Sequence, residues 1–228
     1  MGTLYWQLND CWPVVSWSSI DYCDRWKALQ YYAKRFYAPI AISCCEEGFI
    51  TQLEHINIQP QELANIRYAA TLFGTNETRH SVSGSVCWQI RSHDGAILHE
   101  ETQPITMEPL SAMKLADVPC EMLAVDINTR YLSYQLKNAQ EIVLSEGTTI
   151  LSLPKYFKFL PPKLNVFVEN NLVVVEADSY AKSVEIYSDT DDFVLSDNFF
   201  DMNAGRKVLT VVEGHCANLK ARSVWNIR

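Results

Sequence analysis

The hydrophobic pattern of this 228-residue chain changes its period at Ala38. Downstream of that residue, apolar side chains tend to recur at every second position, and Ser85–Ser92 is the clearest case. The apolar members of that stretch are Val86, Trp88 and Ile90. Such alternation indicates a β-strand with one buried face, because successive side chains of a strand point to opposite sides. His93-Asp94-Gly95 then leads into a second strand at Ala96–Glu100, since Asp-Gly is a strong hairpin signal. The fold class is therefore predicted to be mainly β.

The same pattern predicts a first immunoglobulin-like β-sandwich over residues 38–158. Beyond the hairpin, strands are expected at Asn65–Phe73, Arg130–Leu136 and Thr148–Leu153. Gly74-Thr75-Asn76-Glu77 is interpreted as the turn that ends the first of these strands. Seven to nine short antiparallel strands at this spacing are typical of a sandwich.

A second, smaller immunoglobulin-like sandwich is predicted over residues 159–228. Leu160-Pro161-Pro162 marks the linker, because two prolines cannot sit in a central strand. Lys163–Glu169 and Leu172–Ala177 flank Asn170-Asn171, which indicates a hairpin. Further strands are expected at Ser183–Tyr187, Phe193–Ser196 and Lys207–Val212.

Residues 1–37 have a different character, because they hold four of the six tryptophans. These are Trp6, Trp12, Trp17 and Trp26. Thr3–Leu8 is an aromatic-rich apolar run and is predicted to be a buried strand. Asn9–Pro13 carries turn chemistry, and Ser16–Asp21 reads as a polar loop.

A helix is predicted to follow over Asp24–Tyr37, with Asp24 as its N-cap and Pro39 ending it. The predicted apolar face consists of Trp26, Leu29, Ala33 and Phe36. Lys34 and Arg35 fall in the last turn, where cations favour the negative end of the helix dipole. We expect this helix to dock on the first sandwich.

Composition excludes several classes of partner and site. The chain has 19 Lys and Arg against 27 Asp and Glu, a net charge of -8, which disfavours a nucleic acid or an anionic membrane as partner. Its longest apolar runs are too short for a transmembrane helix. The seven cysteines lack a metal-binding or disulfide pattern and are predicted to be free, mostly buried thiols. No metal and no cofactor is expected.

No catalytic constellation stands out in the sequence. Glu46-Glu47, Glu100-Glu101 and Asp189–Asp192 are adjacent acidic residues around strands and turns, and each is interpreted as solvated. The five histidines are scattered, and no nucleophile or phosphate-binding motif occurs. Asn76-Glu77-Thr78 is a glycosylation sequon and a weak signal by itself.

The aromatic opening is the exception. Trp12 lies in a turn beside Asn9 and Asp10. Sugars stack their C–H faces on indole rings while short polar side chains bind their hydroxyls, so this turn suits a saccharide site. A core role is favoured instead for Trp17 and Trp26, and both roles stay open for Trp12.

The residues near the start of the chain resemble a known family. Gly2–Pro13, Ser16–Tyr22 and Arg25–Leu29 closely resemble the β-mannosidases of glycoside hydrolase family 2. In that family this stretch is the last strand, loop and helix of the catalytic barrel, which implies that residues 1–37 are the end of a barrel. Two later stretches, Ser83–Trp88 with Asp94-Gly95 and Leu195–Asp201, resemble the immunoglobulin-like domains that follow.

The resemblance implies a retaining glycosidase that releases terminal β-mannose from the non-reducing ends of oligosaccharides. Both catalytic glutamates of the family belong to earlier barrel strands, expected upstream of Met1, so this chain is expected to be inactive alone. Its implied partners are a β-mannoside oligosaccharide and its own catalytic barrel. The compartment stays open between the periplasm, the extracellular space and the lysosome.

Carried over to this chain, the resemblance places Trp12 at the sugar subsite, with Asn9 and Asp10 supporting that rim. Either Trp6 or Gln7 would face the barrel interior, because the two alternate on the strand. Without a barrel, Gly2–Ile20 is expected to be displaced or to pair with a sandwich edge. The chain departs from the family at Cys23-Asp24, where Tyr-Gly is common and a glycine-permitted turn is altered.

Three alternatives accompany this interpretation. The chain could be a stand-alone carbohydrate-binding or interaction sandwich, which the lack of a catalytic pair favours. It could be a structural pair of domains that buttresses the barrel. The full-length enzyme could also be a related family 2 exo-glycosidase, such as an exo-β-glucosaminidase.

Overall fold

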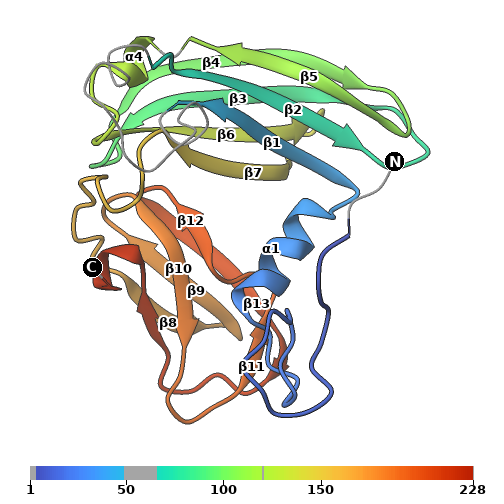
Figure 1. The fold of residues 1–228 in the computed structure, drawn as a ribbon, viewed down its shortest axis with the longest axis vertical. Coiled ribbons are helices and arrows are strands. Elements are labelled where there is room, and N and C mark those ends of the chain that lie inside the picture. The colour runs from blue at the N-terminus through green and yellow to red at the C-terminus, as the bar shows by residue number, and fades with distance from the viewer. Residues whose placement is uncertain (1–3, 49–65, 120, 228) are drawn as a thin grey trace. The chain divides into compact units, whose positions relative to one another are not determined.

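The computed structural model describes residues 4–48, 66–119 and 121–227 (Figure 1). The chain divides into two compact units, one of residues 38–160 and one in which residues 1–37 group with residues 161–228. Antiparallel strands dominate both units, which confirms the prediction of a mainly β chain with immunoglobulin-like sandwiches.

The first unit consists of two antiparallel sheets, and its described elements are β1 (Ile40–Glu47), β2 (Ala69–Asn76), β3 (Val82–Ser92), β4 (Ile97–Met107), β5 (Ser111–Val118), α4 (Glu121–Ala124), β6 (Arg130–Asn138) and β7 (Val143–Ile150). One sheet has the order β1-β2-β5 and the other β4-β3-β6-β7. Their inner faces form one apolar core.

The alternation on β3 is confirmed: Val86, Trp88 and Ile90 are fully buried. The His93-Asp94-Gly95 turn is confirmed as well, with Gly95 at φ 93° and its N–H donating to the Ser92 carbonyl over 2.8 Å. The strands that it joins are longer than predicted, because pairing between β3 and β4 continues to Val82 and Met107.

The structure explains Gly84, the glycine within Ser83–Trp88, one of the stretches that resemble the family. A side chain there would place its Cβ 1.9 Å from the Lys137 carbonyl oxygen of the neighbouring strand β6. Only glycine lets β3 and β6 approach this closely.

The predicted turn at Gly74–Glu77 is wrong, because β2 continues through Asn76 and pairs with both β1 and β5. Asn76 is fully buried, and its side-chain amide donates to the carbonyls of His80, Met107 and Glu108 over 2.8–3.2 Å. Propensity favours Asn in turns, but here the amide satisfies three backbone acceptors. This use of Asn76 closes the sequon to a glycan in the folded chain. The expected start of the strand at Asn65 lies outside the described residues.

The second sandwich has sheets of order β11-β13-β9-β8 and β12-β10-β14. Its elements are β8 (Asn165–Glu169), β9 (Leu172–Ala177), β10 (Ala181–Tyr187), β11 (Phe193–Leu195), β12 (Phe200–Met202), β13 (Gly205–Gly214), β14 (Lys220–Arg222) and the 3₁₀ helix η1 (Val224–Ile227). Asn170 and Asn171 both have positive φ, 51° and 62°, and close the β8–β9 hairpin as predicted.

Helix α1 (Ala28–Phe36) begins later than predicted, with Lys27 and not Asp24 at its N-cap. Asp24 has a φ of 62°, which no helical residue adopts. The buried side chains of α1 are Tyr31 and Ala33, whereas Phe36 of the predicted apolar face is exposed.

The prediction that this helix docks on the first sandwich is wrong. Figure 1 shows α1, in blue, beside the orange strands of the second sandwich, with which it shares a compact unit. The Leu195 N–H of β11 donates to the Tyr31 hydroxyl over 3.4 Å, and the Tyr31 and Phe199 rings lie 5.9 Å apart. The contact residues of the sandwich lie more than 150 positions away in the sequence, so the spacing of the helix could not reveal them.

The predicted strand at Thr3–Leu8 is also wrong for its described residues, 4–8. The chain here makes only isolated bridges, a parallel one between Asn9 and Ile20 and an antiparallel one between Ile20 and Trp26. A barrel strand needs a neighbour on each side, and without them the backbone groups of this segment bond to its own residues.

Six cysteines fall within the described residues, and all six are free thiols there. The expectation that most are buried is wrong, since Cys11, Cys23 and Cys45 are exposed. Cys44, on the opposite face of β1 from Cys45, has its pKa raised to about 11 by burial. Within the described residues, no helix has the length and apolar character to span a bilayer, and no cluster of His, Cys, Asp or Glu is arranged to hold a metal ion.

Candidate functional site

Residues 4–27, here named the aromatic segment, carry large aromatic side chains in solvent. Trp6, Trp12 and Trp17 are 74%, 64% and 77% exposed. The predicted core role of Trp17 is therefore wrong. Trp26 is partly buried and meets Tyr31 of helix α1 edge-on, with ring centres 5.3 Å apart. Exposed tryptophans in one short segment form an apolar surface of the kind that marks a binding site.

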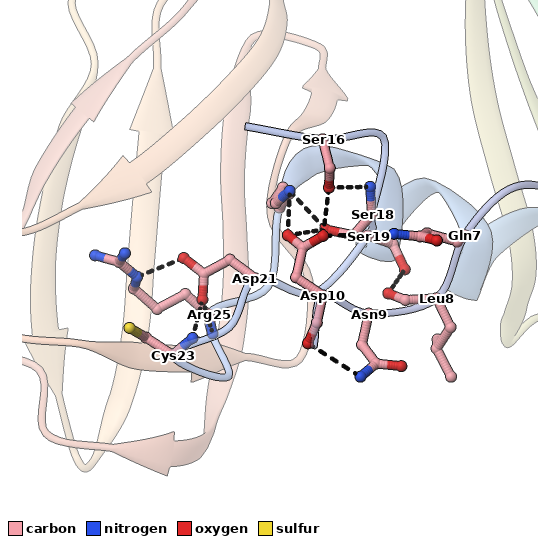
Figure 2. Close-up of polar contacts among 11 residues, drawn as sticks. Gln7, Leu8, Asn9, Asp10, Ser16, Ser18, Ser19, Asp21, Cys23 and Arg25 are labelled. Carbon is pink, nitrogen blue, oxygen red and sulfur yellow. Dashed lines mark hydrogen bonds and ion pairs between the residues drawn. The ribbon is translucent and has the colours of Figure 1, made fainter. Parts of the chain in front are cut away.

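A buried carboxylate holds this segment in shape. Figure 2 shows the Asp10 side chain pointing at Ser16 and Ser18. The Ser16 hydroxyl donates to Oδ1 over 2.5 Å and the Ser18 hydroxyl donates to Oδ2 over 2.7 Å. The Lys27 ammonium lies 3.5 Å from Oδ2 and donates to Ser18 Oγ over 2.6 Å. Both ends of the loop that carries Trp12 and Trp17 are thus tied to the residue before helix α1.

The electrostatics of this network favour the ionised carboxylate. Hydrogen bonds from Ser16 and Ser18 lower the pKa of Asp10 below its ordinary value, and the charge of Lys27 adds to them against the opposing effect of burial. The carboxylate is therefore anionic at neutral pH.

Backbone hydrogen bonds and a second hydroxyl complete the frame. The Ser19 hydroxyl donates to the Leu8 carbonyl over 2.9 Å and lies 2.7 Å from Gln30 Oε1, on helix α1. The Ile20 N–H donates to the Leu8 carbonyl over 2.9 Å, and the Asp10 N–H donates to the Ile20 carbonyl over 3.2 Å. The two sides of the segment are thereby joined without a regular sheet.

A tight turn connects the segment to the helix. Asp21 Oδ1 accepts the N–H groups of Cys23 and Arg25 over 2.8 and 3.0 Å, and its Oδ2 lies 2.8 Å from Arg25 Nε. Burial raises the pKa of Asp21, but the combined effect of these hydrogen bonds is larger, so the pKa of Asp21 lies below its ordinary value. Asp24, the position where the resemblance has glycine, has a positive φ of 62°, a conformation that glycine adopts more readily than other residues.

The predicted site residues separate into two groups. Trp6, Trp12 and Asn9 are exposed, whereas Asp10 is buried and its oxygens are occupied by Ser16, Ser18 and Lys27. Asn9 donates through Nδ2 to the Asp10 carbonyl over 3.3 Å. The Trp6–Gln7 peptide bond is cis.

Sequence reasoning missed Ser16, Ser18 and Lys27 as members of this network. The two serines that flank Trp17 were the available signal. A side-chain hydroxyl that donates to a carboxylate eight residues earlier has, however, no fixed spacing that a pattern search could use.

The acidic pairs of the sequence do not form a catalytic pair in the described structure. Glu100 and Glu101 are on β4 and contact Gln89 and Gln103, and Asp189 pairs with Lys220. These contacts agree with the interpretation of Glu100-Glu101 and Asp189 as solvated surface groups. Glu46 departs from that interpretation, because its Oε2 is buried without a hydrogen-bond partner among the described residues and burial raises the pKa of its carboxyl group.

Family models match most of the described β structure. Residues 69–156 match a mannosidase Ig/CBM-like domain, and residues 159–227 match an Ig-fold domain family named for mannosidases.

Individual proteins agree with these matches. The chain is 41% identical over 70 residues to the β-mannosidase of Bos taurus, an alignment that covers 29% of this chain and 8% of that enzyme. It is 60% identical over 40 residues to the β-mannosidase of Capra hircus, covering 18% of this chain and 5% of that enzyme. It is 49% identical over 43 residues to β-mannosidase A of Aspergillus terreus, covering 19% of this chain and 5% of that enzyme. The chain therefore matches less than a tenth of the length of these relatives.

Solved structures share the fold. The β-D-mannosidase of Dictyoglomus thermophilum superposes with a TM-score of 0.69 at 22% identity, over 96% of this chain and 25% of that one. The exo-chitosanase CsxA of Amycolatopsis orientalis superposes with a TM-score of 0.61 at 14% identity, over 96% of this chain and 29% of that one. The family models and the sequence relatives support this chain as a carboxy-terminal fragment of a glycoside hydrolase family 2 β-mannosidase with immunoglobulin-like domains, and the solved structures show that the fold is shared.

Proposed function

We propose that this chain is the carboxy-terminal part of an enzyme that hydrolyses terminal, non-reducing β-D-mannose residues by a retaining mechanism. In this proposal residues 1–37 are the end of the catalytic barrel, and residues 38–158 and 159–228 are immunoglobulin-like domains that support it. The observation that carries the proposal is Trp12, exposed on a loop that the buried Asp10 holds in shape.

The roles of the site residues follow from their exposure. Trp12 and Trp6 offer flat apolar rings to the C–H face of a sugar, and Asn9 offers a polar group beside them. Asp10 supports the rim from beneath, because its oxygens accept bonds from its own segment. Because the Asp10 network fixes the position of Trp12 before the sugar binds, binding avoids the loss of conformational entropy that ordering a free loop would require.

The chemistry itself is proposed to come from residues outside this chain. A retaining glycosidase needs two carboxyl groups about 5–5.5 Å apart, one as nucleophile and one as acid and base. The chain contributes sugar contacts and support but no catalytic carboxylate, so it should not hydrolyse a mannoside alone.

The test is Trp12→Ala in the full-length enzyme, assayed on an aryl β-mannoside. We expect kcat/KM to fall about tenfold or more, because the variant loses a contact to the sugar. Trp225→Ala is the matched control, since Trp225 is also exposed but lies in η1 of the second sandwich. An unchanged kcat/KM in Trp12→Ala would overturn the assignment of the sugar site.

A second candidate function is saccharide binding by the chain alone, which the exposed tryptophans favour. Calorimetric titration of the 228-residue chain with manno-oligosaccharides separates the two. Binding that Trp12→Ala abolishes would support a binding module, whereas no binding together with an active full-length enzyme would support the hydrolase region. Comparing aryl β-mannoside with aryl β-glucosaminide in the full-length enzyme would decide between a mannosidase and an exo-β-glucosaminidase.

A further inference from the structure

Helix α1 links the aromatic segment to the second sandwich. On one side Lys27, at the N-cap, and Gln30, in the first turn, hold Asp10, Ser18 and Ser19 of the segment. On the other side the last turn of the helix reaches the loop between β11 and β12, residues 196–199. The helical pattern predicts for Lys34 and Arg35 only an interaction with the helix dipole, but in the structure both side chains also contact the 196–199 loop.

Arg35 is the centre of this second set of contacts. Its Nη1 donates to Asp197 Oδ1 and, over 3.1 Å, to the Asn198 carbonyl, while its Nη2 donates to the Phe199 carbonyl over 3.1 Å. The neighbouring Lys34 donates to the Ser196 carbonyl over 2.7 Å. Hydrogen bonds from a guanidinium to a carboxylate and to carbonyls are charge-assisted and stronger than neutral ones.

The loop is shaped for this cation. Phe199 has a φ of 52°, a conformation that is costly for a bulky side chain and that persists only where the surroundings enforce it. Buried Asn198 bonds both the N–H and the carbonyl of Ile186 on β10, which fixes the loop to the sheet. The loop thus presents two carbonyls and a carboxylate from a rigid base.

We propose that Arg35 is a positioning residue for sugar binding: by locking helix α1 to the 196–199 loop, it lets the second sandwich set the orientation of the Trp12 loop. This inference rests on the proposed function for its link to the sugar. These contacts of Arg35 with residues 197–199 are here called the clamp. Through the clamp the second sandwich helps to shape the proposed sugar subsite, although none of its own residues is assigned to that subsite.

The structural arm of the test uses Arg35→Met, which keeps an aliphatic stem but removes the guanidinium, in the 228-residue chain. Hydrogen exchange is followed at the amides of Ser19, Ile20 and Lys27, which donate within the aromatic segment. We expect exchange there to accelerate about tenfold, with the amides of β9 and β13 unchanged. The matched control is Arg222→Met, which removes an ion pair with Glu185 on the same sandwich and should leave the segment unaffected.

Two results of this arm would overturn the proposal. Unchanged exchange in the aromatic segment would show that the clamp does not hold it. Equal acceleration in β9 and β13 would show that Arg35 serves the stability of the whole unit and has no separate positioning role.

The functional arm uses the full-length enzyme and a double-mutant cycle with Trp12→Ala. Arg35→Met should raise KM for an aryl β-mannoside about threefold or more with a smaller change in kcat, and should add little once Trp12 is gone. A full additional effect in the Trp12→Ala background would overturn positioning through this loop. If Trp12→Ala alone is silent, the proposed function fails, while the exchange arm still decides whether the clamp exists.

Discussion

Tryptophan has opposite uses in the two regions of this protein. In the first sandwich Trp88 is fully buried, packs in the core between two sheets and stacks on His99 at 5.0 Å. In the aromatic segment Trp6, Trp12 and Trp17 are mostly exposed, and the buried groups are Asp10, Ser18 and Ser19. The sandwich has its apolar groups inside, whereas the segment has polar groups inside and aromatic rings outside.

The inverted arrangement has a physical cost that points to function. Burial of an aromatic ring stabilises a domain, and an exposed ring forgoes that stabilisation. A buried carboxylate in turn needs hydrogen bonds and a nearby cation, which Ser16, Ser18 and Lys27 supply. A segment built this way is specified by directional polar contacts, so its shape is defined while its rings remain free to bind.

The largest effect is expected for a substitution of the buried tryptophan in the first sandwich. Trp88→Ala should lower the unfolding free energy of the first sandwich by about 3–5 kcal/mol, because it leaves a large cavity in the core. Hydrogen exchange at the β3 and β6 amides measures it. Trp88→Phe is the control and should cost much less, since the buried indole Nε1 has no hydrogen-bond partner among the described residues. Equal losses in both variants would contradict the cavity argument.

A smaller and more local effect is expected for Asp10→Asn, which keeps the shape of the side chain and removes its charge. The variant should accelerate exchange at Ser19 and Ile20 and leave β3 unchanged, because only the polar frame is weakened.

The pH dependence of the Asp10 network has a definite sign. Because the folded state lowers the pKa of Asp10 below its ordinary value of 3.8, its contribution is complete above that value and is lost as the pH falls through the folded pKa. Amide spectra of the segment between about pH 5 and pH 2 follow this loss. A transition above pH 5, or one that persists in Asp10→Asn, would assign it to another group.

The smallest effect is expected for a substitution in the turn that connects the aromatic segment to helix α1. Asp24→Gly should stabilise the turn before helix α1 by about 0.5 kcal/mol, because glycine adopts a positive φ without the steric cost that Asp24 bears. Exchange at the Arg25 and Lys27 amides reports the change. Asp24→Ala is the control and should destabilise the turn, and a loss of protection in Asp24→Gly would contradict the argument from φ.

Local patterns predicted the sandwiches well. The β3 alternation, the Asp94-Gly95 hairpin and the Asn170-Asn171 turn all follow from interactions within a few residues, and the structure confirms each of them. Local patterns failed at the expected Gly74–Glu77 turn, at the Asp24 N-cap and in the segment of residues 4–8. The apolar run of that segment has the composition of a strand, but a strand forms only where partners satisfy its backbone.

The sequence by itself determined the mainly β class, the turns at Asp94-Gly95 and Asn170-Asn171, and the resemblance to β-mannosidases. The tertiary structure decided which sandwich holds helix α1, the burial of Asp10 and the exposure of Trp17. Strand alternation and turn chemistry are encoded at a spacing of a few residues, so a reader of the sequence can find them. The contacts of Arg35 with residues 197–199 and of Lys27 with Asp10 join distant positions, and only the folded chain brings those groups within hydrogen-bonding distance.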